Sequence, residues 1–198
     1  MSARPLLAGV ALAAALALPL SGATITIVNL DTAGVGFNDA TPRSPVGGNP
    51  GTTLGEQRLN VVKYAAAFWG EKLQSPVEIR VEAQWKAMNC SASSATLASA
   101  GTIFLDADFT GAPRANTWYP IALASKLAGV DLAEGDNHVT ANFNISIEDG
   151  SCGFPKKFYY GLDAQPTAGT SDFATVVIHE LGHGLGFQSF VERSTGKR

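Results

Sequence analysis

A helical pattern that runs directly into a strand pattern sets the strongest limit on how this chain folds. The capping box TLGE at 53–56 announces a helix, and apolar residues follow it at helical spacing until Pro76. The next segment, 77–85, reads VEIRVEAQW and alternates strictly, as a strand with one buried face does. Each element has one apolar face that must be covered, so the pattern predicts a helix packed against a sheet.

The rest of the chain extends this arrangement. Short apolar or alternating runs predict further strands at 24–28, 102–105, 139–147 and 158–160. The outward positions of 139–147 are polar but uncharged, which is typical of an edge strand. A short helix is expected at 121–127, and TSD at 170–172 caps a final helix. The predicted fold class is α+β, a twisted and mostly mixed sheet of about five strands packed with two long helices.

Composition and charge restrict the class of protein. The chain has 198 residues, enough for one ordinary core, so we expect a single domain. A hydrophobic fraction of 45% and a charged fraction of 16% are typical of a globular protein. The net charge of -3 comes without a basic stripe or a polybasic run, so neither nucleic acid nor an anionic membrane surface is an expected partner.

The first residues have the pattern of an export signal. One cation at Arg4 precedes the apolar run LLAGVALAAALALPL, and the small residues SGA at 21–23 form a cleavage site. A transmembrane anchor would need roughly twenty apolar residues, and Pro19 interrupts this shorter run. The sequence therefore predicts a signal peptide at 1–23, a mature domain at 24–198, and a secreted or periplasmic protein with no membrane segment after cleavage.

Cysteine usage agrees with export. Cys90 and Cys152 are the two cysteines, and an exported chain with one pair is expected to form one disulfide. Closing that loop would stabilise the fold by about 4 kcal/mol in the chain-entropy treatment. The alternative role, as soft metal ligands, would call for C-x-x-C spacing, which these two residues do not have.

The final predicted helix carries the chemistry. His179 and His183 lie four residues apart in HELGH, so their imidazoles stand one above the other and both can reach one ion. Neutral imidazoles are zinc ligands, so we expect Zn²⁺ as the cofactor. Glu180 lies on the flank of that face, where it can bond a water at the metal without occupying the metal itself. The alternative is a buried helix with two incidental histidines.

The stretch HELGHGLG resembles the H-E-x-x-H motif of the zincin metallopeptidases, and its continuation resembles the metzincins, where a glycine three residues after the second histidine ends the helix. The resemblance implies a metzincin-like N-terminal subdomain whose edge strand receives an extended substrate. It also implies a secreted zinc endopeptidase that acts on proteins or peptides, with His179 and His183 as metal ligands and Glu180 as general base. The runs IVNLDTAGVGFND and PVGGNPGTTLGEQR are similar to secreted bacterial proteins with a protease-associated domain.

The chain departs from that family where a third ligand is expected. Three residues after Gly186 stands Ser189, a poor zinc ligand, and no methionine follows Met88 to form a Met-turn. Glu192 follows the helix too closely for a ligand from a separate helix, and His138 is the one other histidine that could complete the site. We expect the missing ligand and the far wall of the cleft to come from a C-terminal subdomain beyond this chain.

Two further alternatives follow from the residues. Asp31, Asn38 and Asp39 in the Gly/Pro-rich loop 31–53 could offer oxygen ligands to calcium, or could bond their own backbone in turns. The whole chain could also be a non-catalytic secreted binding or structural domain that kept the helix and lost the metal site.

Overall fold

The computed structural model describes residues 22–189 and Ser194, so most of the predicted signal peptide lies outside the described residues. The main sheet has four strands in the order β1-β2-β6-β3. β1, β2 and β6 run parallel, and β3 pairs antiparallel with β6 at one edge. The strand bounds are β1 Ile25–Asn29, β2 Ile79–Lys86, β3 Ala98–Thr102 and β6 Val139–Asn144.

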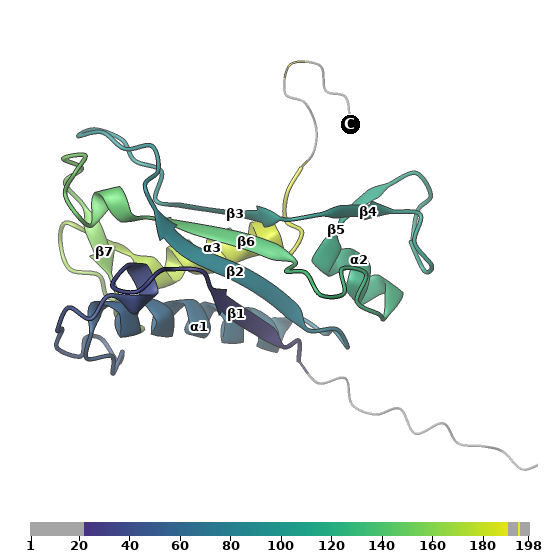
Figure 1. Cartoon of the computed structure of the whole chain (residues 1–198), viewed down its shortest axis with the longest axis horizontal. Helices are drawn as coiled ribbons and strands as arrows, with labels where there is room; N and C mark the ends of the chain where they lie inside the picture. The colour runs from purple at the N-terminus through teal and green to yellow at the C-terminus, as the bar shows by residue number, and fades with distance from the viewer. Residues whose placement is uncertain (1–21, 190–193, 195–198) are drawn as a thin grey trace, which may run out of the picture.

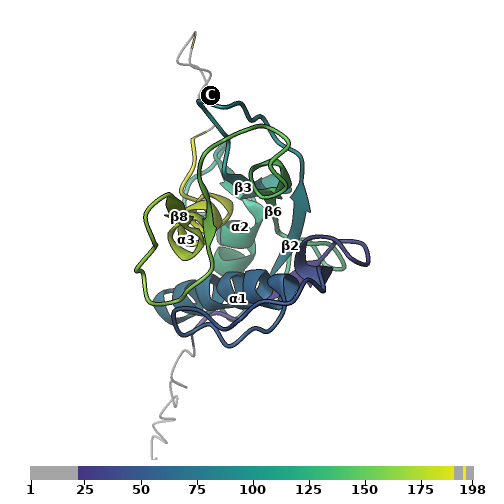
Figure 2. The same cartoon turned by 90° about the vertical axis from the view of Figure 1, so that its left-hand side faces the viewer.

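Two long helices cover one face of this sheet. α1 (Leu54–Lys72) lies under the β1 side and α3 (Phe173–Gly184) lies under the β3 side (Figures 1 and 2). The two helices touch each other, and the indole N–H of Trp69 in α1 donates to the carbonyl of Ile178 in α3 at 2.9 Å. The helix-on-sheet prediction from residues 53–85 is therefore confirmed, and the fold is mixed, with three helices in the described part, compatible with α+β.

The smaller elements form satellites of the main sheet. β4 (Leu105–Ala107) and β5 (Trp118–Pro120) make an antiparallel hairpin that leads into α2 (Ile121–Ala128), beyond one end of the sheet (Figure 1). β7 (Lys157–Tyr159) and β8 (Thr170–Asp172) form a parallel pair. The described residues also contain two 3-10 turns, η1 (Gly36–Asn38) and η2 (Ile145–Ile147). The short helix near 121–127 is confirmed, whereas the main sheet has four strands because the short apolar runs pair outside it.

The edge-strand prediction for 139–147 is wrong. β6 lies between β2 and β3, and the side chains of its two asparagines, Asn142 and Asn144, are buried. Asn142 accepts a hydrogen bond from Gln84 on β2, and Asn144 accepts one from the backbone N–H of Met88 and donates to the carbonyl of Thr96. Uncharged amides can be buried at an interior strand when every polar atom finds a partner. The edge strands are β1 and β3, and the sequence of β3, ASAGT, has little strand signal.

The strand expected at 102–105 is also displaced. The chain pairs with β6 only up to Thr102 and then enters the β4 hairpin at Leu105. The side-chain hydroxyl of Thr102 donates to the carbonyl of Phe104 and accepts from the N–H of Ile121, at 2.6 and 3.1 Å. These bonds turn the chain away from the sheet at the residue where the apolar run had suggested that a strand begins.

Aromatic packing sets the position of α3. Phe173, in its first turn, is fully buried. Its ring centroid lies 4.7 to 5.4 Å from four other aromatic rings, those of Trp85, Phe143, Phe158 and Tyr160. Burying one such ring stabilises a fold by roughly 1.5–3 kcal/mol, and ring pairs add to this. The start of α3 is therefore anchored in the centre of the core.

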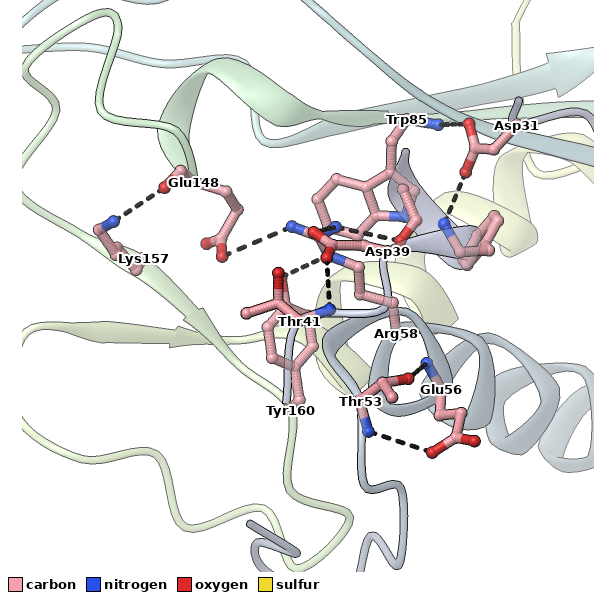
Figure 3. Close-up of polar contacts among 12 residues, drawn as sticks. Asp31, Asp39, Thr41, Thr53, Glu56, Arg58, Trp85, Glu148, Lys157 and Tyr160 are labelled. Atoms are coloured by element: carbon pink, nitrogen blue, oxygen red, sulfur yellow. Dashed lines mark hydrogen bonds and ion pairs between the residues drawn. The ribbon is translucent and has the colours of Figure 1, made fainter. Parts of the chain in front are cut away.

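A buried arginine joins α1 to the aromatic cluster and to the loops beside it (Figure 3). The side chain of Arg58 is 1% exposed, and its guanidinium stacks on Trp85 at 4.2 Å. It donates to the hydroxyl of Tyr160 at 3.2 Å and pairs with the carboxylates of Asp39 and Glu148 at 3.5 and 3.9 Å. Burial raises the pKa of Tyr160 far above its usual range, so the hydroxyl stays protonated as the arginine's acceptor.

The Asp and Asn side chains of loop 31–53 that could have bound calcium bond to the protein backbone instead. The two carboxylate oxygens of Asp31 accept from the backbone N–H groups of Trp85 and Phe37, both at 2.8 Å. The side-chain amide of Asn38 donates to the carbonyl of Asp31, and Asp39 accepts from the loop backbone two residues on. These oxygens serve the loop itself, which favours the turn interpretation over a calcium site.

The capping box at the start of α1 is confirmed. The hydroxyl of Thr53 accepts from the N–H of Glu56 at 3.1 Å, and Glu56 accepts in return from the N–H of Thr53 at 3.1 Å. Glu56 also accepts from the backbone N–H and the hydroxyl of Thr52. The hydrogen bonds from Thr52, and then that from Thr53, hold the pKa of Glu56 below its ordinary value of 4.5.

Cys90 and Cys152 form a disulfide, which confirms the predicted pairing. Their Cα atoms lie 5.5 Å apart, and the bond ties the loop after β2 to the segment after η2. Across residues 22–189, none of the helices is both long and apolar enough to cross a lipid bilayer.

Candidate metal centre

The sequence of α3 places its two histidines on the side of the helix that faces away from the core. Asp172 caps the helix by accepting from the N–H of Thr175 at 3.0 Å. Phe173, Val177 and Leu181 then follow at four-residue spacing and are buried against the sheet and α1. Because those residues occupy the inner face of the helix, HELGH places its two imidazoles on the outer face.

The two histidines converge on one point. The Nε2 atoms of His179 and His183 are 3.1 Å apart, with the rings edge to face and their centroids 4.7 Å apart. Two zinc ligands at bond lengths of 2.0–2.1 Å in a tetrahedral site are about 3.3 Å from each other. The spacing of the two nitrogens therefore fits a shared zinc ion.

A backbone carbonyl determines which nitrogen of His183 is available. Its Nδ1 lies 2.7 Å from the carbonyl oxygen of Phe187. A carbonyl can only accept, so Nδ1 carries the proton and Nε2 of the neutral ring keeps its lone pair toward His179. An imidazole that donates its outer N–H to a carbonyl is a pattern found behind metal-ligating histidines.

The end of α3 brings that carbonyl into place. Gly186 has a φ of +128°, and its N–H donates to the carbonyl of His183 at 3.1 Å. The N–H of Phe187 donates to the carbonyl of Gly182 at 2.9 Å, which completes a Schellman-type ending. The predicted role of Gly186 as the helix end is confirmed, and the turn it makes returns Phe187 to His183.

Glu180 reaches from α3 to the edge of the sheet. Its Oε2 accepts from the backbone N–H of Ala100 in β3 at 3.0 Å. The carboxylate therefore lies between the histidine pair on the helix and the outer side of the edge strand. Sequence patterns did not reveal this contact because β3 has a weak strand signal and is 80 residues away in the chain.

His138, the one other histidine that could have completed the site, is used inside the fold instead. His138 is completely buried at the start of β6. Its Nδ1 accepts from the backbone N–H of Arg80 at 3.2 Å, and its Nε2 lies 3.1 Å from the carboxylate of Asp131. Both ring nitrogens are therefore occupied by partners within the fold, which argues against His138 as a metal ligand.

The two positions weighed after α3, Ser189 and Glu192, add no further ligand to the described residues. Ser189 is exposed beyond the end of α3, and Glu192 lies outside the described residues. Between residues 22 and 189, no group of three or more His, Cys, Asp and Glu side chains is arranged to hold a metal ion. The described part of the chain thus brings together His179, His183 and Glu180, which is two ligands and a candidate base.

Comparison of the chain with known protein families, with curated proteins and with solved structures gives no match.

Proposed function

We propose that this chain acts as a secreted zinc-dependent endopeptidase and has a metzincin-like N-terminal subdomain. The observation that carries the proposal is the convergence of His179 Nε2 and His183 Nε2, 3.1 Å apart, beside a glutamate that contacts the edge strand. His179 and His183 would hold the ion. Bound there, zinc supplies Lewis-acid polarisation of a carbonyl and a reactive water at neutral pH.

In this proposal Glu180 moves the protons of peptide hydrolysis. Its Oε2 lies 3.0 Å from the backbone nitrogen of Ala100, so the carboxylate lies between α3 and β3. In the proposed reaction it takes a proton from the attacking water and passes it to the leaving amine. Positioned acid–base groups of this kind contribute about 10²–10⁴-fold to rate.

The outward backbone groups of the edge strand β3 favour a peptide as the substrate. The carbonyl of Leu97 and the N–H of Ile103 bond to β6, so the alternate residues Ala98 and Ala100 turn their backbone groups outward. An extended peptide can add to such an edge through main-chain hydrogen bonds, which require no particular side chain. Because Glu180 contacts the same edge at Ala100, an added strand would pass directly by the proposed base.

Export is part of the proposal. The pattern at 1–23 is that of a signal peptide, and the disulfide between Cys90 and Cys152 is of the kind that persists in oxidising compartments. The chain would act outside the cytoplasm on proteins or peptides.

A second candidate is a non-catalytic secreted binding or structural domain with a degenerate metal site. The serine at 189, where a metzincin has its third ligand, favours this reading. The two candidates differ in zinc affinity and in the role of Glu180.

The test measures zinc content and casein hydrolysis of the full-length protein and of three variants. His179→Ala should lose zinc, whereas Glu180→Ala should keep zinc and lose hydrolysis by about 10²-fold or more. Glu71→Ala, on the exposed surface of α1, is the matched control and should change neither quantity. Equal hydrolysis by the Glu180 variant would refute the proposed base, and a folded protein without zinc would favour the second candidate.

A further inference from the structure

A pocket of about 330 Å³ lies next to the candidate metal centre, between the β4–β5 hairpin, α2 and the turn after α3. Its volume is at the lower end of the range of ligand pockets, about 300–1,000 Å³. Trp118, on its wall, is 63% exposed, which is unusual for so large an apolar side chain. The lining includes Leu105, Trp118, Pro120, Leu123, Gly186 and Gln188.

The pocket adjoins the C-terminal ends of α3 and β3. Gly186 comes three residues after His183, and a Cβ on it would lie 3.6 Å from the side chain of Leu123. Gln188 lies beside β3, with its Oε1 3.9 Å from the place of a Cβ on Gly101. Figure 1 shows that β4, the first strand of the β4–β5 hairpin, lies beyond the end of β3. A chain that passes Glu180 along the edge strand would therefore arrive at the pocket.

An unsatisfied donor lies on that route. The Nε2 atom of Gln188 is buried and has no hydrogen-bond partner among the described residues. A buried amide N–H without an acceptor is costly and is uncommon in native structures. The carbonyl groups of an extended peptide beside β3 would provide the missing acceptor.

The uncharged lining of the pocket favours an apolar side chain of a bound peptide. None of the ten residues that line the pocket is charged, and Leu105, Trp118, Pro120 and Leu123 are apolar. A charged side chain would lose hydration there without gaining an ion pair, whereas an aromatic or aliphatic one would gain contact area.

We propose that this pocket binds a large apolar side chain of an extended peptide substrate, on the N-terminal side of the bond to be cleaved. The proposal rests on the proposed peptidase function. Antiparallel addition to β3 is the more stable pairing, and it places the peptide's N-terminal part beside the C-terminal end of β3, where the pocket lies. Gly101 and Leu105 are one and five residues beyond Ala100, so the bound residue stands one to five positions before the scissile bond.

The test separates binding from cleavage. Full-length protein with Glu180→Gln, loaded with zinc, is immobilised and exposed to a random decapeptide library, and the tightest ligands are sequenced. In these ligands each Phe, Leu or Trp is replaced in turn by Ala. We expect one position at which the replacement raises Kd by about ten-fold or more, the discrimination typical of a fitted apolar pocket.

Variants of Trp118 then assign that position to the pocket. Because this side chain is largely exposed, replacing it leaves the core intact. Trp118→Ala should abolish the ten-fold effect at that position, and Trp118→Lys should make Asp or Glu the favoured residue there. Tyr64→Ala removes another exposed aromatic ring, on α1 and away from the pocket, and should leave the preference unchanged.

The outcomes distinguish the two proposals. An unchanged preference in both Trp118 variants, or no peptide bound by the Glu180→Gln protein, would overturn the pocket. Cleavage of the same ligands by the parent protein locates the bond, and a selected residue on its C-terminal side would also overturn the placement. Selective binding that depends on Trp118, without cleavage by the zinc-loaded parent, would sustain the pocket and refute the peptidase.

Discussion

Replacing Gly184 by Ala should push the end of the histidine-bearing helix away from the sheet. A Cβ on Gly184 would lie 2.2 Å from Cγ1 of Val139 and 3.2 Å from its Cβ. Val139 is fully buried at the start of β6, and its branched side chain has few alternative rotamers. The overlap must therefore be relieved by moving α3 or β6 rather than by turning one side chain.

The size of the effect can be worked out from opposing terms. Overpacking of a dense core costs about 1–3 kcal/mol. Alanine in place of glycine regains at most about 1 kcal/mol in a helix interior, and less in the last turn. The expected net destabilisation is about 1–2 kcal/mol. Gly182→Ala is the matched control, because its Cβ would meet only the edge of the Trp69 ring, at 3.2 Å, and should cost less than about 1 kcal/mol.

A double-mutant cycle measures whether Val139 is the cause. Val139→Ala alone should destabilise by about 2 kcal/mol through the cavity it leaves. In that background the space for the new Cβ exists, so Gly184→Ala should become neutral or stabilising, which gives a coupling of about 1–3 kcal/mol. Urea unfolding followed by circular dichroism supplies the free energies. Additive effects, with coupling below about 0.5 kcal/mol, would refute the contact between the end of α3 and β6.

Four further predictions concern stability. Arg58→Ala should lower the free energy of unfolding in urea by about 3–5 kcal/mol, because it leaves a buried carboxylate without its cation. The stability of Arg58→Lys should lie between that of the parent protein and that of Arg58→Ala. A loss below about 1 kcal/mol for Arg58→Ala would contradict this. Thr53→Ala should cost about 1 kcal/mol as a lost helix cap. The lowered pKa of Glu56 contributes stability above pH 4.5 that disappears as the pH falls through its folded-state pKa, so Glu56→Gln should flatten the acid side of the Tm profile. Replacing Cys90 and Cys152 by Ser should cost about 4 kcal/mol for a loop closed across 62 residues, and an unchanged urea midpoint would argue against that contribution.

Sequence patterns predicted the elements whose signals are local. The start of α1, the alternation of β2 and the cap of α3 each depend on residues within one or two turns of each other, and all three are confirmed. The order of the strands in the sheet could not be predicted from such local signals. The buried Asn142 and Asn144 made β6 resemble an edge strand, because an amide on the surface and an amide bonded inside a sheet look alike in sequence.

The sequence by itself determined that His179 and His183 share one face of a helix, because that follows from 3.6 residues per turn. It also determined the export pattern and left two cysteines available to pair. Only the tertiary structure decided that Glu180 meets Ala100, that His138 is used by Arg80 and Asp131, and that a pocket opens beside the site. These contacts join residues far apart in the chain, so they depend on which strands become neighbours, and that choice is made by the packing of the whole core rather than by any local pattern.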